Sequence, residues 1–362
     1  MAEMANAQRV VVGMSGGVDS AVAALRLIEA GHDVHGLYMS NWDDEDVHCS
    51  NAQDYQDARA VARELGIVLH RVSFEPEYRE RVFADFLDEY RRGRTPNPDV
   101  LCNREIKFGV CLHYAQRLGA QWFATGHYAR LEHQDDGPML LRGADAGKDQ
   151  SYFLCGVERE RFARVLFPIG GLDKSEVRAI AQRAGLPVFD KRDSTGICFI
   201  GERPFAEFLA AYLPEQPGPI ESADGTQLGT HRGLHFYTLG QRGGLEIGGV
   251  RGGSGDPWYV SHKDTRRNAL IVVSARERAT VTSGALRTGA INWLAATHDA
   301  PFTAGVKIRY RQPDQGALVT PQPDGGVHIR FDTPQWAATP GQTAALYDGE
   351  RCLGGGAIEE TL

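Results

Sequence analysis

The 362-residue chain has few cysteines, no long apolar run and no excess of positive charge. Its six cysteines are too few for a disulfide scaffold and form no C-x-x-C pair, so we expect reduced thiols and no structural metal. No apolar run approaches the roughly 18 residues that span a bilayer, and the amino terminus lacks the basic and apolar regions of a signal peptide. We therefore expect a cytoplasmic protein without membrane contact.

Charge is unevenly distributed along the chain. The formal net charge is −8, from 39 basic and 47 acidic side chains, which argues against nonspecific coating of nucleic acid. Residues 91–107, however, contain five basic and two acidic side chains. The stretch "KIRYR", residues 307–311, places three cations around an aromatic ring, a combination suited to phosphate contact and base stacking. A local RNA-binding groove is compatible with the acidic total.

The first part of the chain alternates strand-like and helix-like segments. Apolar runs typical of buried strands are "RVVVGM", "DVHGLYM", "IVLHRVSF" and "QWFATGHYA". Between them lie stretches with helical periodicity, such as "VDSAVAALRLIEA" and "AQDYQDARAVAREL". This alternation predicts an α/β fold with a doubly wound parallel sheet. In such sheets, ligands bind beyond the carboxyl ends of the strands.

The pattern changes after residue 213, where 23 of the 42 glycines fall in the shorter remainder and helical periodicity nearly vanishes. Short runs such as "NALIVVSA" and "GGVHIRFD" are spaced like the strands of small barrels. We therefore predict three domains. They are an α/β catalytic domain at 1–205, a small Gly-rich central module at 206–280 and a C-terminal β-barrel at 281–362.

The stretch "GMSGGVDS", residues 13–20, connects the first predicted strand to the first predicted helix. Its glycines let the backbone close on an anion, and the amino end of the helix carries a partial positive charge. A Walker A loop would also have a lysine, which is missing here. The alternative is a tight strand-to-helix turn in which Asp19 or Ser20 caps the helix.

Two cysteines have unusual neighbours. Cys102 lies in "NPDVLCNREIKFG" close to Arg104 and Lys107, and nearby cations favour the reactive thiolate. We expect the surrounding residues 93–109, which contain proline and asparagine, to be too irregular for a core element. Cys198 in "DSTGICFIGER" lies near a basic residue, but it could equally be a small apolar side chain in a strand. We expect Cys111, Cys155 and Cys352 to be buried structural residues.

The Ser-Gly-Gly-x-Asp-Ser motif resembles the signature of the N-type ATP pyrophosphatase (PP-loop) family, whose fold is adenine nucleotide alpha hydrolase-like. Together with "NPDVLCNREIKFG", "DSTGICFIGERPF", "ATGHYAR", "GKDQSYFL" and "TLGQRGGL", it resembles the bacterial tRNA-specific 2-thiouridylases. The match extends from the first strand to the terminal "CLGGGAIEE". It implies a sulfurtransferase that uses ATP to thiolate position 2 of the wobble uridine in the tRNAs for glutamate, glutamine and lysine.

The resemblance also implies a mechanism. ATP, with Mg²⁺ as its counter-ion, adenylates O2 of the uridine and releases pyrophosphate. A persulfide on Cys198 then attacks C2 and AMP leaves, while Cys102 assists sulfur release and can end in a disulfide with Cys198. Asp99 is the implied general acid or base. The sulfur donor would be a relay protein or a cysteine desulfurase. The residues implied in ATP binding are Gly13, Met14, Ser15, Gly16, Gly17, Val18, Asp19, Ser20, Met39 and Gly126.

A further set of residues is implied in tRNA recognition. Asn97, Pro98 and Asp99 would receive the extruded uridine. The residues that would contact tRNA elsewhere are His127, Lys148, Asp149, Gln150, Arg309, Tyr310 and Gln342. Each has a structural alternative: His127 as a hydrogen-bonded histidine at a strand end, 148–150 as a solvated helix start, and 307–311 as an ordinary strand.

Two other functions are kept open. A PP-loop relative that amidates its substrate or modifies tRNA in another way would need no sulfur and no pair of cysteines. A non-catalytic tRNA-binding protein with a redox-sensitive Cys102 and Cys198 pair would release no pyrophosphate.

Overall fold

The structure is a computed structural model that describes residues 7–42, 51–193, 204–247 and 256–362. Cys198, one of the two predicted reactive cysteines, lies outside the described residues. Within the described ranges no helix is both long and apolar enough to cross a membrane.

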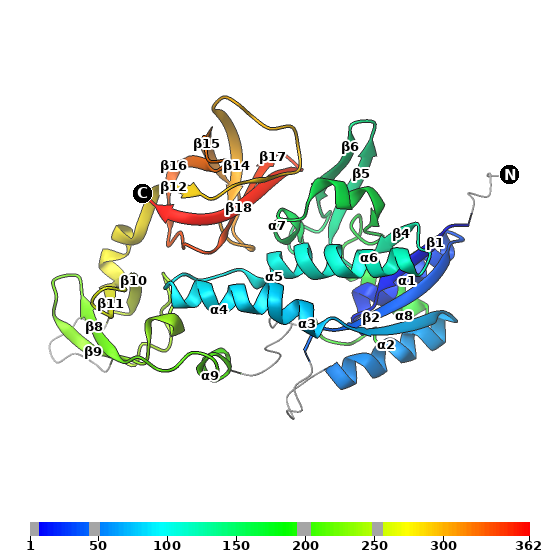
Figure 1. Cartoon of the computed structure of the whole chain (residues 1–362), viewed down its shortest axis with the longest axis horizontal. Helices are drawn as coiled ribbons and strands as arrows, with labels where there is room; N and C mark the ends of the chain where they lie inside the picture. The colour runs from blue at the N-terminus through cyan, green and yellow to red at the C-terminus, as the bar shows by residue number, and fades with distance from the viewer. Residues whose placement is uncertain (1–6, 43–50, 194–203, 248–255) are drawn as a thin grey trace.

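A five-stranded parallel sheet forms the centre of the amino-terminal domain, on the right of Figure 1. The strand order is β3-β2-β1-β4-β7, and every pair is parallel. The strands are β1 (Arg9–Gly13), β2 (Asp33–Ser40), β3 (Val68–Ser73), β4 (Trp122–Ala124) and β7 (Val165–Leu166). β1 is the middle strand of the sheet. Its three valines are fully buried, as expected for a strand that is covered on both faces.

Helices cover both faces of this sheet. Val10 and Val12 pack into a core with α1 (Val18–Glu29) and α8 (Lys174–Arg183). Val11 points the other way, into a core with the helices between residues 75 and 117. Because successive strand residues face opposite sides, these three valines divide the domain into two apolar layers. The predicted doubly wound α/β fold is confirmed.

The other helices are α2 (Asn51–Leu65), α3 (Glu75–Tyr78), η1 (Arg79–Phe83), α4 (Ala84–Arg91), α5 (Pro98–Leu101), η2 (Cys102–Cys111), α6 (Leu112–Arg117), α7 (Ser151–Leu154), η3 (Arg159–Arg164) and α9 (Phe205–Ala210). Among them, α3, η1 and α4 follow one another without a break, as do α5, η2 and α6.

The expectation that residues 93–109 are too irregular for a core element is wrong for residues 98–109, whereas 93–97 form neither helix nor strand. α5, η2 and α6 form one continuous helical rod from Pro98 to Arg117. Proline fits the first turn of a helix, because its missing N–H would have had no partner there. Cys102 lies on the inner side of this rod, with only 2% of its surface exposed.

The central module contains a four-stranded sheet of order β10-β11-β8-β9. Its elements are β8 (Gly218–Ser222), β9 (Gln227–His231), η4 (Leu234–Phe236), β10 (Trp258–Asp264), β11 (Ala269–Ser274) and η5 (Ala275–Val281). Ile220, Val260 and Leu270 belong to its own small core. The module therefore has an apolar interior separate from that of the α/β domain.

The carboxyl-terminal strands close into a barrel, as predicted. Six strands follow the order β12-β16-β15-β14-β17-β18, and pairing of β12 with β18 closes the ring. The strands are β12 (Thr282–Thr288), β14 (Phe302–Lys307), β15 (Gln315–Pro321), β16 (Val327–Trp336), β17 (Thr343–Asp348) and β18 (Arg351–Thr361), with β13 (Asn292–Trp293) paired to β18. Residues 308–311 follow the end of β14, so most of "KIRYR" is not strand.

A hairpin of the α/β domain extends the sheet of the barrel. It consists of β5 (Ala129–Gln134) and β6 (Gly137–Arg142), and it meets β18 where Leu141 pairs with Arg351. The sequence analysis did not predict this connection. It fixes the barrel against the α/β domain, next to α7 in Figure 1.

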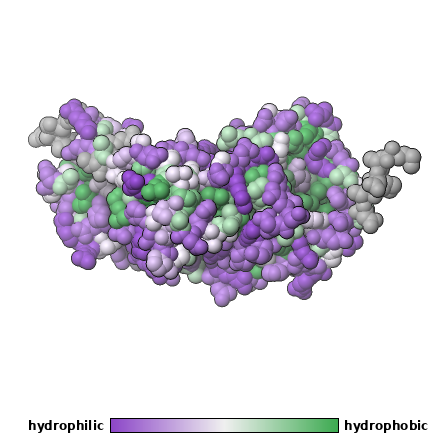
Figure 2. Space-filling view, turned by 90° about the horizontal axis from the view of Figure 1, so that it is seen from above, coloured by the Kyte–Doolittle hydropathy of each residue, from purple (hydrophilic) through white to green (hydrophobic). Residues whose placement is uncertain are grey.

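The outer surface is mainly hydrophilic. Figure 2 shows apolar residues scattered in small areas on the face seen from above. Among the described residues, the exposed large apolar side chains are Val68, Phe189 and Leu362, which are far apart in sequence.

A buried lysine joins the central module to the α/β domain. α4 reaches from the parallel sheet towards the module (Figure 1), and Gly93 follows its end. Lys263 on β10 is 9% exposed and donates a hydrogen bond from Nζ to the Gly93 carbonyl oxygen at 3.1 Å. Burial lowers the pKa of Lys263 to about 8.

This lysine predicts a specific pH dependence of stability. Between pH 8 and the ordinary lysine pKa of 10.5, the unfolded chain holds the Lys263 proton while the folded chain has lost it. The free energy of unfolding of the wild type should therefore rise with pH, by up to about 1.4 kcal/mol per pH unit, relative to Lys263→Met. Urea unfolding of both proteins between pH 7.5 and 10 measures the difference. Parallel pH curves would contradict the burial of a titrating lysine.

Candidate functional site

The candidate site lies at the carboxyl edge of the parallel sheet, where β1 and β4 end. The strand order reverses between these two neighbours, and open α/β sheets bind ligands at such a point. Gly13 ends β1, and Gly126 follows β4 closely. A Cβ atom on Gly126 would lie 2.7 Å from the backbone of Asp19 and Ser20. Only glycine allows this contact, so Gly126 brings the β4 loop directly onto residues 13–20.

The loop at residues 13–20 is a compact turn into α1. Ser15 donates a hydrogen bond from its backbone N–H to Ser20 Oγ at 3.2 Å, and Ser20 Oγ donates to the Gly17 carbonyl oxygen at 3.1 Å. Gly17 is the N-cap, and no side chain caps α1. The alternative, in which the side chain of Asp19 or Ser20 caps the helix, is therefore wrong. The amino end of α1 points its N–H groups towards the loop, as an anion site requires.

Gly16 has a backbone that other residues rarely adopt. Its φ is +74°, and a Cβ atom there would lie 2.2 Å from the Asp54 carbonyl oxygen on α2. The loop is thus pressed against α2 at a position where a side chain has no room.

Two lysines from distant parts of the chain supply positive charge beside the loop. Lys174 at the start of α8 contacts both carboxylate oxygens of Asp19, at 2.7 and 2.8 Å. Lys191 donates to the Gly16 carbonyl oxygen at 3.0 Å and also contacts Asp54 and Asp57. The sequence analysis missed both lysines. The absence of a lysine within the loop was the one indication that cations would come from elsewhere.

Asp193 connects this charge cluster to the predicted tRNA contacts. It accepts hydrogen bonds from Lys148 at 2.6 Å and Arg178 at 3.0 Å, and Lys174 lies 2.8 Å away. Although burial opposes it, bonding to Lys148 and Lys174 lowers the pKa of Asp193 to about 2. Asp193 therefore stays ionised at neutral pH. It is the last described residue before the segment that contains Cys198.

Cys102 and Asp99 lie one turn apart at the start of the rod that begins at Pro98. Burial raises the pKa of the Asp99 carboxyl group, and the positive charge of Lys107 partly opposes this shift. A carboxyl group with a raised pKa can exchange a proton closer to neutral pH. Cys102 belongs to the main apolar core.

His127 has a buried environment. Its Nδ1 lies 2.7 Å from Thr125 Oγ1, and its ring packs against Phe108 and Phe167. Burial, with a smaller contribution from Lys107, lowers the pKa of His127 well below its usual value, so the ring is neutral. These contacts agree with the structural alternative for His127, in which it is a hydrogen-bonded histidine at a strand end. Contact of His127 with tRNA stays a prediction.

The three residues at 148–150 have different surroundings. Asp149 is 4% exposed; its carboxylate accepts hydrogen bonds from Gly143 and Ser151, and Lys307 of the barrel lies 3.5 Å away. Gln150 Oε1 accepts a hydrogen bond from the Tyr128 N–H at 2.9 Å. Lys148 and Gln150 are both partly exposed.

Barrel residues reach the same region. The Tyr310 hydroxyl donates to the Lys148 carbonyl oxygen at 3.2 Å, and its ring lies 4.5 Å from that of Phe153. Arg309 donates to the Ala337 carbonyl oxygen at 2.8 Å, and burial lowers the pKa of its guanidinium. Gln342 contacts residues 95 and 96, directly before Asn97. The predicted tRNA contacts of the barrel thus lie beside those of the α/β domain.

The basic side chains of residues 91–107 are largely paired. Arg91 contacts Asp88, Arg92 and Arg94 both contact Glu89, and Arg104 contacts Glu105. Asp88 and Glu89 lie on α4, just before residues 91–107. Their negative charge therefore reduces the local excess of positive charge in that segment. Arg91 and Arg92 remain exposed.

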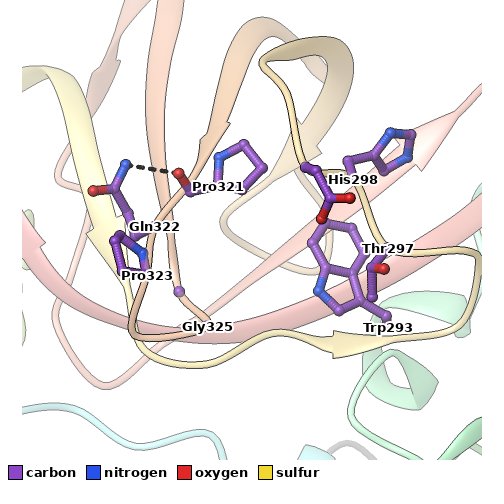
Figure 3. Close-up of a pocket in the computed structure, with 9 residues that line it drawn as sticks. Trp293, Thr297, His298, Pro321, Gln322, Pro323 and Gly325 are labelled. Atoms are coloured by element: carbon purple, nitrogen blue, oxygen red, sulfur yellow. Dashed lines mark hydrogen bonds between the residues drawn. The ribbon is translucent and has the colours of Figure 1, made fainter.

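Two pockets lie away from these residues. One of about 480 Å³ in the barrel is lined by Trp293, Thr297, His298, Asp299, Pro321, Gln322, Pro323, Gly325 and Gly326 (Figure 3). Another, of about 420 Å³, lies between α2 and β3. Neither contains a residue predicted to bind ATP or tRNA or to act in catalysis.

Comparison with family models divides the chain into three consecutive matches. Residues 8–202 match a "tRNA methyl transferase HUP domain", residues 206–274 a "tRNA methyl transferase PRC-barrel domain" and residues 283–358 an "Aminomethyltransferase beta-barrel domain".

Curated relatives match over nearly the whole chain. The tRNA-specific 2-thiouridylase MnmA of Halalkalibacterium halodurans is 53% identical, with 98% of this chain and 95% of the relative covered. The enzyme of the same name from Chromohalobacter salexigens is 54% identical, with 98% and 93% covered. Among solved structures, a 4-thiouridine synthetase in complex with RNA and ATP is 21% identical over 54% of this chain and 46% of that chain. The TM-score between the two structures is 0.35.

The crowding at Gly16 predicts a large effect of a single methyl group. Gly16→Ala should weaken ATP binding by roughly tenfold or more, equivalent to about 1.4 kcal/mol, because Asp54 and the loop must move apart. Gly185→Ala is the matched control, since Gly185 also has a positive φ of +67° but no atom within 4 Å of the added Cβ. Isothermal titration with ATP and thermal unfolding compare the two variants. Equal ATP affinities would mean that the loop does not need its contact with α2.

Proposed function

The chain belongs to the tRNA-specific 2-thiouridylase family, and on this basis we propose that it replaces O2 of the wobble uridine in tRNA by sulfur, at the expense of ATP. The observation that carries the proposal is the identity of 53–54% with named 2-thiouridylases over 98% of the chain. The tRNAs for glutamate, glutamine and lysine are the proposed substrates. Such substrates imply the cytoplasm as the place of action.

The first proposed step is adenylation of the uridine. Gly13 to Ser20 would hold the phosphates of ATP with backbone N–H groups and serine hydroxyls, and Met39 and Gly126 would line the adenosine pocket. Lys174 and Lys191 support this role, because they place ammonium groups beside a loop that has no cation of its own, although each is paired with two carboxylates. Mg²⁺ would arrive with the nucleotide. Uridine O2 attacks the α-phosphorus of ATP, the bond to the β-phosphate oxygen breaks, and pyrophosphate leaves.

The second proposed step transfers sulfur. The terminal sulfur of a Cys198 persulfide attacks C2, and the C2–O2 bond breaks as AMP leaves. The Cys102 thiolate then attacks the Cys198 sulfur, so that the S–S bond to the transferred sulfur breaks and a Cys102–Cys198 disulfide forms. The two thiols lose two electrons and the transferred sulfur gains them as the thiocarbonyl of 2-thiouridine. A persulfide donor and an external thiol reductant would restore the enzyme.

Asn97, Pro98 and Asp99 are the proposed receptors of the uridine. Asp99 lies one turn before Cys102, and Asn97 is the N-cap of the same helical rod, which supports this role. Extrusion of the base from its stack costs a few kcal/mol, and least in a single-stranded loop such as the anticodon. We also propose that the three domains comprise residues 1–205, 206–280 and 281–362.

A second candidate is transfer of a methyl group, because the descriptions of two of the family models contain the words "tRNA methyl transferase". This reaction would need no pyrophosphate release and no second cysteine.

Product analysis distinguishes these functions. The protein, ATP, Mg²⁺, a persulfide donor and unmodified tRNA should yield 2-thiouridine at the wobble position, with AMP and pyrophosphate. Cys198→Ser should abolish the product, because the serine hydroxyl cannot carry a persulfide sulfur. Nucleoside mass spectrometry separates sulfur exchange from methyl addition. A methylated product, or thiolation retained by Cys198→Ser, would overturn the proposed chemistry.

The raised pKa of Asp99 predicts the acid side of the pH–rate profile. If Asp99 acts as a base, kcat should fall as the pH drops through a value above 3.8, since protonation removes the acceptor. Asp99→Asn should lower kcat by roughly 10²- to 10⁴-fold and remove this pH dependence. Asp88→Asn is a control, because Asp88 is exposed and its carboxylate contacts Arg91. An unchanged acid limb in Asp99→Asn would assign the titration to another group.

A further inference from the structure

Two pairs of adjacent arginines lie where α4 meets the central module. Arg91 and Arg92 are at the carboxyl end of α4, and Arg266 and Arg267 are in the turn between β10 and β11. We call these four residues the arginine cluster. All four are exposed, and the carboxyl end of α4 faces β10 and β11 in Figure 1. The two pairs come from different domains, so only the fold brings them together.

A close contact fixes the two pairs next to each other. Gly93 directly follows the first pair in sequence, and Thr265 directly precedes the second. A Cβ atom on Gly93 would lie 2.8 Å from Thr265 Cγ2. The hydrogen bond from Lys263 Nζ to the Gly93 carbonyl oxygen, at 3.1 Å, holds the same two segments together. Each pair is thus one residue away from the contact between the two domains.

Carboxylates lie behind two of the arginines. Arg267 donates from one guanidinium nitrogen to both carboxylate oxygens of Glu221 on β8, each at 2.8 Å. The Glu221 side chain is 11% exposed and that of Arg267 58%. Arg92, 66% exposed, lies 3.6 Å from Glu89, which is 11% exposed. Arginine has five N–H donors, so a carboxylate behind it restricts the side chain and still leaves donors for a second anion.

The other two arginines are held more loosely. Arg91 contacts Asp88 at 2.7 Å, but both side chains are more than half exposed, so this ion pair contributes little and exchanges readily for a ligand. Arg266 bonds to Asp264 through its backbone N–H, and within the described ranges no carboxylate pairs with its side chain. A role in offsetting the helix dipole of α4 would explain Arg91 and Arg92 alone, because the second pair lies in a turn between strands.

The charge that this surface turns outward is positive. By count, the four arginines are matched by four nearby acids, which are Asp88, Glu89, Glu221 and Asp264. Three of these acids are mostly buried, whereas the guanidinium groups are exposed. A ligand that approaches from solvent therefore meets arginine first. Their planar, forked donors match the oxygens of a phosphate group.

We propose that the arginine cluster binds the phosphate backbone of the anticodon arm while residues 97–99 receive the uridine. The inference rests on the proposed function, because it takes residues 97–99 as the receptor of the base. Five residues lead from Arg92 to Asn97, and an extended chain of that length spans at most about 18 Å. A helical nucleic-acid strand places a phosphate roughly every 3.4 Å along its axis. The phosphates that reach the cluster therefore lie within a few nucleotides of the extruded base.

The salt dependence of tRNA binding tests the inference. Arg91→Gln/Arg266→Gln removes one loosely held arginine from each pair, so the fold should be unaffected and thermal unfolding checks this. Each lost phosphate contact lowers the slope of log Kd against log salt concentration by roughly 0.7 to 0.9, so the double variant should lower it by about 1.5. Fluorescence anisotropy should give the same change with whole tRNA and with an isolated anticodon stem-loop. Arg91→Lys/Arg266→Lys, which keeps both charges, should retain most of the slope.

A matched control removes the same charge elsewhere. Arg26 and Arg183 are exposed arginines at the carboxyl ends of α1 and α8, away from the proposed ATP loop at the other end of α1. Arg26→Gln/Arg183→Gln should leave the slope within about 0.3 of the wild type. With saturating ATP, the cluster variant should raise KM for tRNA and keep kcat for thiolation within about twofold of the wild type, because the cluster is remote from the reacting atoms.

Two results would overturn the inference. Equal slopes for the two glutamine double variants would mean that only the overall charge of the protein matters. A change seen with whole tRNA but absent with the stem-loop would assign the cluster to another part of the tRNA. If the wild type itself forms no 2-thiouridine, the proposed function fails, and the binding measurement still decides whether the cluster holds the anticodon arm.

Discussion

Backbone packing at the carboxyl edge of β1 and β4 is the constraint on which the site depends. Gly126 lies so close to Asp19 and Ser20 that any side chain there would collide with them. Gly16 is pressed in the same way against α2. The loop is therefore held by neighbouring backbone on two sides. A phosphate-binding turn needs this support, because its N–H groups bind an anion well only when their directions are fixed beforehand.

The charge that the loop lacks comes from residues more than 150 positions later in the chain. Lys174 and Lys191 reach the loop through Asp19 and Gly16, and Asp193 ties Lys174 to Lys148. Because the ion pairs already restrict these lysine side chains, little further conformational entropy would be lost when a ligand binds beside them. A connected set of ion pairs thus extends from the proposed ATP loop to the proposed tRNA contacts, and Asp193 ends it next to the segment that contains Cys198.

Periodicity predicted the regular elements well and the irregular ones poorly. The valines of β1 and the helical pattern of α1 are local properties, so the parallel sheet and its helices followed from sequence. The segment at 93–109 was misjudged, because proline was taken as a sign of irregularity where it begins the rod that contains Cys102. The link of the β5–β6 hairpin to β18 depends on a partner more than 200 residues away, which no local pattern contains.

The sequence by itself identified the family. The motifs around residues 13–20, Asp99, Cys102 and Cys198 are local strings of residues, so they could be compared with a known family before any fold was described. Only the tertiary structure decided which groups surround them. It assigned Lys174 and Lys191 to the loop, buried Asp149 and His127, and placed the Gln342 amide beside the backbone before Asn97. Burial and pairing arise from contacts between distant segments, so they exist only once the three domains have packed together.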